Sequence, residues 1–270
     1  MSDTNAGEQR RWNDERWTAV WPKRERLTGE VTQYLLAAAA LRPGERVLDI
    51  GAGGGVSALP AARAVAPDGE VVGVDISTVL TRLAEKRATE QGVENAHFRL
   101  GDMQLATVAG TPFDVALSQF GVMFFDEPVV AFANIRRHLR PGGRLAFACW
   151  QPADRNPWFV GPAVADLLPP PAPLLPGKVP TGPFALGDPD VTAGILDAAG
   201  FTGIHRQAYE LEVDAPSDSV VDDDQLTVMG IPDDRLPEAR ERVAAQLRRF
   251  EQAPGRSRFP LAFQVFAATA

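Results

Sequence analysis

A glycine-rich turn at residues 50–55 is the part of this chain best suited to bind a ligand. It follows a short apolar segment, and glycine allows a tight turn and the close approach of a ligand where a Cβ would clash. Twenty-four residues after Gly51, a second apolar segment ends at Asp75. A carboxylate there can accept hydrogen bonds from both ribose hydroxyls of a nucleoside. This spacing predicts a site for an adenosine-containing cofactor.

Two residues distinguish the possible adenosine cofactors. A dinucleotide-binding turn has a further glycine three residues after its second one, and this chain has Val56 at that place. Asp49 sits in the turn, where its carboxylate would repel a pyrophosphate. The same carboxylate would attract the sulfonium and ammonium groups of S-adenosylmethionine (SAM), by roughly a few kcal/mol in a partly dry cleft. Both residues therefore favour SAM over a nicotinamide dinucleotide.

Five segments resemble motifs of the class I SAM-dependent methyltransferases, in that family's order and at its usual spacing. The chain is most similar to the broad group of small-molecule enzymes that includes the ubiquinone/menaquinone C-methyltransferases. The resemblance extends from about residue 42 to residue 150, and it implies the fold and the cofactor more strongly than the methyl acceptor. The segments are 47–55, 74–77, 101–103, 113–116 and 139–145.

The resemblance implies which residues contact SAM. The methionine end is expected at the glycine turn and at the end of the fourth strand, the ribose at the end of the second strand, and the adenine just after the third. Two carboxylates also have structural explanations, because Asp75 could be stabilised by a helix N-terminus and Asp102 could cap a helix. The expected contacts are Asp49, Gly51, Ala52, Gly53 and Gln119, then Asp75 and Ile76, then Asp102 and Met103.

Trp12 and Trp17 resemble aromatic residues that precede the SAM-binding core in this group. A tryptophan at a cleft offers a flat surface and a cation–π attraction for a sulfonium. Tryptophans on helices also commonly only pack against their neighbours. Cofactor binding and packing therefore both remain open for this pair.

Apolar strands alternate with helical segments after residue 43, which predicts an α/β fold with a parallel sheet and right-handed crossovers. Such a sheet binds ligands beyond the carboxyl ends of its strands. The resemblance implies a Rossmann-like, doubly wound, mostly parallel seven-stranded sheet whose last strand is antiparallel. The strands are expected at 46–50, 70–75, 95–100, 113–119, 144–150, 202–213 and 259–268, and the helices near 55–65, 77–91, 103–109 and 127–139.

The chain divides into N-terminal cap helices, residues 1–42, and a SAM-binding domain, residues 43–270. Residues 1–11 are expected to fray, and one or two helices are expected from 12 to 41. Two lid segments are expected within the domain, 155–187 and the helical insert 215–257. The first has nine prolines between Pro162 and Pro189. Since proline blocks helix interiors, either an extended linker or a substrate lid is consistent with this composition.

Bulky apolar residues in the first lid segment predict a fairly apolar acceptor, such as a quinone-, polyketide- or secondary-metabolite-like molecule. They are Trp158, Phe159, Leu167, Leu168, Leu174, Leu175 and Phe184. Trp150 and Trp158 are candidate substrate contacts. Arg256 or Arg258, near the last strand, could bind an acidic or carbonyl oxygen of the acceptor, and a solvated turn is the other explanation for both.

No catalytic base is evident. His97, His138 and His205 fall near the amino ends of strands, which is the wrong edge of the sheet. No clustered acidic ligands for a metal follow the fourth strand except Asp126 and Glu127. Catalysis by proximity and alignment is therefore expected, and orientation alone can contribute roughly 7–11 kcal/mol.

The net charge of −8 argues against a nucleic-acid substrate, which needs clustered cations. The single cysteine, Cys149, and the lack of a long apolar segment predict a cytoplasmic protein without a disulfide or a membrane span. The remaining alternatives are an NAD(P)-dependent oxidoreductase, a methyltransferase acting on RNA or protein, and a SAM-binding module without catalysis. The oligomeric state stays open, and S-adenosylhomocysteine is the expected product.

Overall fold

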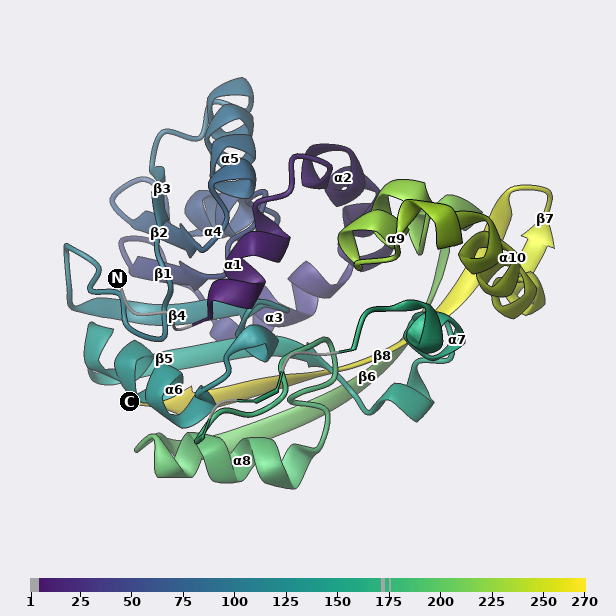
Figure 1. Ribbon diagram of the computed structural model, residues 1–270. Helices are drawn as coiled ribbons and strands as arrows, with labels where there is room; N and C mark the ends of the chain where they lie inside the picture. Colours follow the sequence, from purple (N-terminus) through teal and green to yellow (C-terminus); the bar gives the residue numbers. More distant parts are fainter. Residues whose placement is uncertain (1–4, 171–172, 175) are drawn as a thin grey trace.

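One mixed sheet forms the centre of the protein (Figure 1). The computed structural model describes residues 5–170, 173–174 and 176–270. Strands one to five are parallel, and the last long strand is antiparallel to both of its neighbours. The predicted Rossmann-like fold with an antiparallel last strand is confirmed. In spatial order the strands are β3 (Ala96–Leu100), β2 (Glu70–Asp75), β1 (Arg46–Ile50), β4 (Phe113–Gln119), β5 (Leu139–Trp150), β8 (Arg256–Thr269) and β6 (Thr202–Pro216), with β7 (Glu251–Ala253) beside β8.

Helices cover both faces of this sheet. Successive residues of a strand point to opposite faces, so Val47 packs in one apolar cluster and Leu48 in another. Because both faces are buried, these strands read as nearly continuous apolar runs. The first cluster includes residues of α3 (Val31–Ala39), α4 (Ala58–Val65) and α5 (Thr78–Glu90), and the second includes residues of α6 (Pro128–His138) and α8 (Pro189–Ala198).

Two further helices precede α3, namely α1 (Ala6–Trp12) and α2 (Trp17–Thr28). The prediction of a frayed segment up to residue 11 is wrong for residues 6–11, because tertiary packing holds this short helix. Trp12 is buried, and its ring stacks on Trp17 with ring centroids 4.4 Å apart. Val79 and Leu80 at the start of α5 belong to the same apolar cluster. The cap therefore rests on the helix that follows β2.

The helix predicted near 103–109 does not form, although all of its residues are described. The backbone N–H of Val108 instead donates to Nε2 of His138 at 3.0 Å. The backbone N–H of Gln104 donates to the carboxylate of Asp102 at 2.9 Å, and those of Leu105 and Ala106 donate to the carbonyl of Asp102 at 3.0 and 2.7 Å. The segment thus makes a single turn after Asp102 and does not continue as a helix.

The two expected lid segments pack against each other. The first contains the single turn α7 (Gly161–Val164), and the second contains α9 (Asp223–Val228) and α10 (Leu236–Leu247). Arg242 of α10 pairs with Asp166 at 2.6 Å, and Gln246 donates to the carbonyl of Phe159 at 2.8 Å. Figure 1 shows α9 and α10 beyond one end of the sheet, beside the long strands β6 and β8.

The glycine turn brings the ends of β1 and β4 into backbone contact. Gly51 has a φ of +64°, and a Cβ added to it would lie 2.7 Å from Cα of Gly121. These two strands flank the point where the strand order reverses, which is where open α/β sheets bind their ligands. Only glycine satisfies both the positive φ and the close approach.

Substitution of Gly51 tests this constraint. Gly142 is a matched control, because its φ is +72° and no atom lies within 4 Å of its Cβ position. We expect Gly142→Ala to lower the free energy of unfolding by about 1 kcal/mol through backbone strain alone. Gly51→Ala should lower it by roughly 1–3 kcal/mol more, because the added methyl group meets backbone atoms. Urea denaturation measures both values, and equal losses would contradict the proposed contact.

Candidate active site

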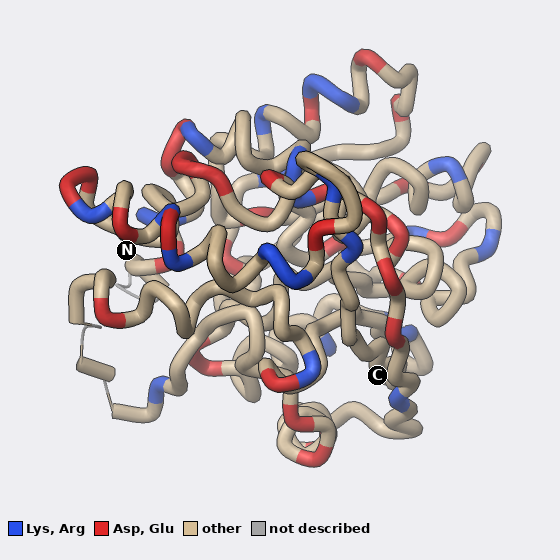
Figure 2. The backbone as a smooth tube through the Cα atoms, turned by 90° about the vertical axis from the view of Figure 1, so that its right-hand side faces the viewer, with Lys and Arg blue, Asp and Glu red and all other residues tan. Residues whose placement is uncertain are grey.

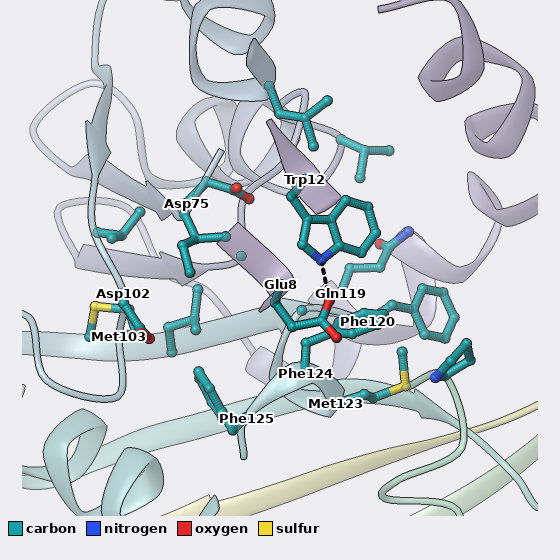
Figure 3. A pocket seen from close by; sticks show the side chains of 18 of the residues that line it. Glu8, Trp12, Asp75, Asp102, Met103, Gln119, Phe120, Met123, Phe124 and Phe125 are labelled. Carbon is teal, nitrogen blue, oxygen red and sulfur yellow. Dashed lines mark hydrogen bonds between the residues drawn. The ribbon is translucent and has the colours of Figure 1, made fainter. Parts of the chain in front are cut away.

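A pocket lies at the carboxyl ends of the parallel strands, under the cap helices. It contains about 1040 Å³ of empty space, a figure that includes the open solvent at its mouth. Figure 3 shows Asp75, Asp102 and Gln119 from the sheet side together with Glu8 and Trp12 from α1. Of the predicted site residues, those that line the pocket are Trp12, Gly51, Asp75, Ile76, Asp102, Met103, Gln119 and Trp150.

Asp75 holds the strand side of the pocket together. One carboxylate oxygen accepts from the backbone N–H of Gly53 at 2.7 Å, and the other accepts from that of Ser77 at 2.8 Å. Burial raises the pKa of this carboxyl group, although its backbone donors oppose the shift. Its contact with Ser77, the N-cap of α5, fits the helix-terminal explanation, and its place in the pocket also suits a ribose.

Asp49 lies behind the glycine turn to which Ala52 and Gly53 belong, and none of the three lines the pocket. The side chain of Asp49 is fully buried, and its Oδ2 accepts from the hydroxyl of Ser57 at 2.7 Å. Burial raises its pKa to about 8. Its Oδ1 has no hydrogen-bond partner among the described residues. A buried acceptor without a partner is rare, so this oxygen fits a cationic ligand group such as the ammonium of SAM.

Asp102 and Met103 form the far end of the pocket. The carboxylate of Asp102 accepts from the backbone and the side chain of Gln104, at 2.9 and 3.3 Å. Burial raises the pKa of Asp102. Met103 is only 3% exposed, and it offers an apolar surface beside this carboxylate. An acceptor next to an apolar face suits a purine with an exocyclic amine.

The tryptophans of the cap take different positions. Trp12 lines the pocket, whereas Trp17 lies behind it and does not. Trp21 also lines the pocket, and its ring covers the glycine turn so closely that a Cβ at Gly53 or Gly54 would collide with it. Trp21 was not among the predicted site residues. Its spacing of four residues from Trp17, which places both on one face of a helix, was the available signal.

Gln119 ends β4, and Phe120 follows it in the chain; both line the pocket. Oε1 of Gln119 accepts from the hydroxyl of Thr32 at 2.7 Å, and its amide donates to the carbonyl of Thr28 at 3.2 Å. Phe120 has a φ of +63°, and its ring stacks on Trp150 at 4.2 Å and 15°. A non-glycine residue with this φ is strained, and such strain is concentrated at functional sites.

The other predicted acceptor residues lie away from the pocket. Trp158 packs behind Trp150, with ring centroids 5.0 Å apart. Arg256 and Arg258 are exposed and belong to β8, which begins three residues earlier than expected. Arg258 pairs with Asp214 of β6 at 2.9 Å. Pairing between the long strands therefore holds these arginines at the end of the sheet, and the structure does not bring them to the pocket.

The lid segments contribute little to the pocket wall. Pro183 is the one described residue of the first segment that lines it, and no described residue of the second does so. Leu175, one of the apolar residues predicted for the first lid segment, lies outside the described residues. Much of the apolar wall opposite the cofactor side was not predicted; it is formed by Met123, Phe124 and Phe125.

The three histidines do not line the pocket. His97 and His205 are exposed on β3 and β6, and His138 is buried as a hydrogen-bond partner of Val108. Within the described ranges, no group of three or more His, Cys, Asp or Glu residues could hold a metal ion. In the same part of the chain, no helix combines the length and apolar character needed to cross a bilayer.

Residues 41–159 match the family model described as a methyltransferase domain. Nocamycin O-methyltransferase of Saccharothrix syringae is 35% identical over 198 residues, which cover 69% of this chain and 70% of that protein. Aklanonic acid methyltransferase DauC of Streptomyces sp. strain C5 is 38% identical over 104 residues, covering 38% and 47%. The C-methyltransferase UbiE of Burkholderia multivorans is 35% identical over 126 residues, covering 45% and 51%.

A solved methyltransferase structure also has this fold. A SAM-dependent methyltransferase from Aquifex aeolicus superposes with a TM-score of 0.52 at 15% identity, and the match covers 98% of both chains. The family model and the nocamycin enzyme confirm the resemblance inferred from the five motifs, and they establish SAM rather than a nicotinamide dinucleotide as the cofactor. The chain belongs to the SAM-dependent methyltransferases and is an enzyme of that family.

Proposed function

We propose that this enzyme transfers the methyl group of SAM to a small, fairly apolar organic acceptor, mainly by holding the acceptor in line with the sulfonium. The carrying observation is the lining of the pocket, which combines carboxylates near the ends of the parallel strands with six aromatic side chains. The curated relatives include proteins named for nocamycin and aklanonic acid, which supports a natural-product-like acceptor. The aromatic residues that line the pocket are Trp12, Trp21, Phe120, Phe124, Phe125 and Trp150.

On the cofactor side, we assign Asp102, Met103 and Ile76 to the adenine end and Asp75 to the ribose. The methionine end would lie over the turn at Gly51, Ala52 and Gly53, next to Gln119. When bound, SAM supplies an electrophilic methyl group. The buried oxygen of Asp49 would balance the charge of its ammonium, and the faces of Trp12 and Trp21 would border the cofactor from above, with Trp17 supporting Trp12.

On the acceptor side, the stacked pair Phe120 and Trp150 offers a flat apolar floor. Such a surface suits a planar, conjugated acceptor, because aromatic stacking favours offset parallel rings. No histidine or metal cluster of the described residues faces this floor. We therefore attribute the rate chiefly to alignment and to the exclusion of water. Trp158 would support Trp150 from behind.

The lid segments would close over this floor. The hydroxyl of Thr181 in the first segment donates to the carboxylate of Glu8 at 2.7 Å, which joins the lid to α1 beside Pro183. The second segment would brace the first through the pair of Arg242 and Asp166. We retain 155–187 and 215–257 as lids over a shared SAM-binding floor.

The distribution of charged residues and the burial of the single cysteine are consistent with the same proposal. Figure 2 shows Lys and Arg interspersed with Asp and Glu over the side that it draws, rather than gathered in one positive stretch. A phosphate backbone is therefore a poor acceptor for this enzyme. Cys149 is buried, and burial raises the pKa of its thiol to about 12, so it would remain a thiol in a cytoplasmic setting.

The direct test is methyl transfer to a panel of acceptors. It is measured as the S-adenosylhomocysteine formed and as a product roughly 14 mass units heavier than the acceptor, since a methyl group replaces a hydrogen atom and adds one CH₂ group. We expect turnover with planar quinones or aromatic polyketides. We expect none with total RNA or with denatured protein at equal mass. Turnover confined to RNA or protein would overturn the small-molecule proposal.

Replacement of Asp75 tests the cofactor assignment. Asp75→Ala should weaken SAM binding by about 10- to 100-fold, because a charged hydrogen-bonding partner of the ribose is lost. The control is Glu70→Ala, at the opposite end of the same strand, where Glu70 pairs with Arg46 at 2.7 Å. Isothermal titration gives the dissociation constants, and cooperative unfolding verifies the fold. An unchanged constant for Asp75→Ala would refute the ribose contact.

The pKa of Asp49 predicts a pH dependence of SAM binding. Its carboxyl group is neutral in the free protein below a pKa of about 8. Pairing with an ammonium requires the ionised form, so binding releases a proton at pH 6. SAM affinity should therefore rise from pH 6 toward pH 8, by at most about tenfold per pH unit, and fall again at higher pH as the α-amino group of SAM loses its proton with a pKa of roughly 8. In Asp49→Asn the part of the slope due to this group should vanish; equal slopes in both proteins would exclude the pairing.

Lid closure predicts a change in hydrogen exchange. With S-adenosylhomocysteine and any acceptor that is turned over, amides of residues 178–187 should exchange at about one tenth of their ligand-free rate or more slowly, because closure hides them from water. Residues 215–257 should follow through their contact with the first lid. The carboxyl-terminal half of α5 serves as an internal control, because it lies away from the pocket. No gain in either lid would place the acceptor elsewhere, against the cap helices.

A further inference from the structure

Arg24 is the one Lys or Arg among the described residues that line the pocket. It lies on α2 between Trp21, which covers the glycine turn, and Thr28, whose carbonyl accepts from Gln119. Spacings of three and four residues put these side chains on one face of the helix. Arg24 is thus placed over the end of the pocket assigned to methionine and to the transferred methyl group.

The guanidinium of Arg24 has no carboxylate partner in the described part of the chain. Its Cζ lies 5.6 Å from the ring centroid of Trp17, so the indole face supports it. Burial, together with the nearby charge of Arg11, lowers the pKa of Arg24 to about 10. It therefore remains a cation at neutral pH, and its neighbours include a second cation rather than an anion.

The two acidic residues of the cap that line the pocket are engaged elsewhere. Glu8 accepts from Nε1 of Trp12 at 2.9 Å and from the hydroxyl of Thr181 at 2.7 Å. Glu25 accepts from Nε1 of Trp21 at 2.6 Å and pairs with Arg87. Neither carboxylate therefore serves as a counter-charge to Arg24.

Arg24 lines the pocket without a carboxylate partner among the described residues, so its guanidinium can receive an anionic group of a ligand there. The planar fork of arginine matches a carboxylate with two parallel hydrogen bonds. We propose that Arg24 receives a carboxylate of a ligand in this pocket. The proposal rests on the proposed function, and it moves the anion-binding role sought at Arg256 and Arg258 to the cap helix. Two sources share this chemistry, the α-carboxylate of SAM and an acidic group of the acceptor.

The first experiment compares SAM with its decarboxylated analogue by isothermal titration. If Arg24 binds the SAM carboxylate, the native protein should prefer SAM by about 10- to 100-fold, and Arg24→Gln should abolish this preference. Arg24→Lys should restore part of it, because it keeps the charge and loses the fork. Arg26→Gln, at an exposed position of the same helix, is the matched control and should bind both ligands as the native protein does.

The second experiment titrates 2-naphthoic acid and 2-naphthamide into the protein saturated with S-adenosylhomocysteine. If Arg24 instead receives an acceptor carboxylate, the native protein should prefer the acid by about tenfold or more. Arg24→Gln should then lose this preference while its SAM affinity stays unchanged. The ligand-free variant should also unfold at about the temperature of the native protein, because Arg24 is only partly buried and forms no ion pair among the described residues.

The outcomes separate the two proposals. A native protein that does not bind SAM would contradict the proposed function. If SAM binds but neither preference depends on Arg24, the carboxylate-binding role is wrong. A marked loss of thermal stability in ligand-free Arg24→Gln would also overturn it, because the side chain would then serve the fold rather than a ligand.

Discussion

The carboxylate of Asp75 is the interaction on which the cofactor side of this protein depends. With two hydrogen bonds it ends β2, fixes the turn at Gly53 and positions Ser77 at the start of α5. Three elements separated in sequence thus meet at one charge. The close backbone contact of Gly51 and Gly121 adds the fourth strand to this arrangement. These few contacts fix the carboxyl ends of β1, β2 and β4, and these ends form the cofactor side of the pocket.

This part of the molecule was predictable because its signals are local. The glycine turn needs particular residues for its backbone, and β1 and β2 are buried on both faces, so their apolar runs stand out in the sequence. The order of the strands followed from the resemblance of the motifs. The residues that end the strands could therefore be assigned to the pocket, and Gly51, Asp75, Asp102 and Gln119 do line it.

The acceptor side was harder to predict because it depends on packing between distant segments. Trp21 and Arg24 line the pocket because α2 packs between α5 and α9, an arrangement that no short motif encodes. In the segment 103–109, where no helix forms, the backbone N–H of Val108 donates to His138, thirty residues away. Arg256 was misplaced because β8 begins earlier than its apolar run. In each case a tertiary contact overrode the local pattern.

The distribution of tryptophan has a spectroscopic consequence. All five tryptophans of the chain are in the pocket wall or directly behind it: Trp12, Trp21 and Trp150 line the pocket, while Trp17 and Trp158 stack or pack on two of these. Under excitation that selects tryptophan over Tyr34 and Tyr209, the emission of the enzyme therefore originates at the site itself. Occupancy by a non-absorbing ligand can be followed in the unlabelled protein, at concentrations well below those that calorimetry requires.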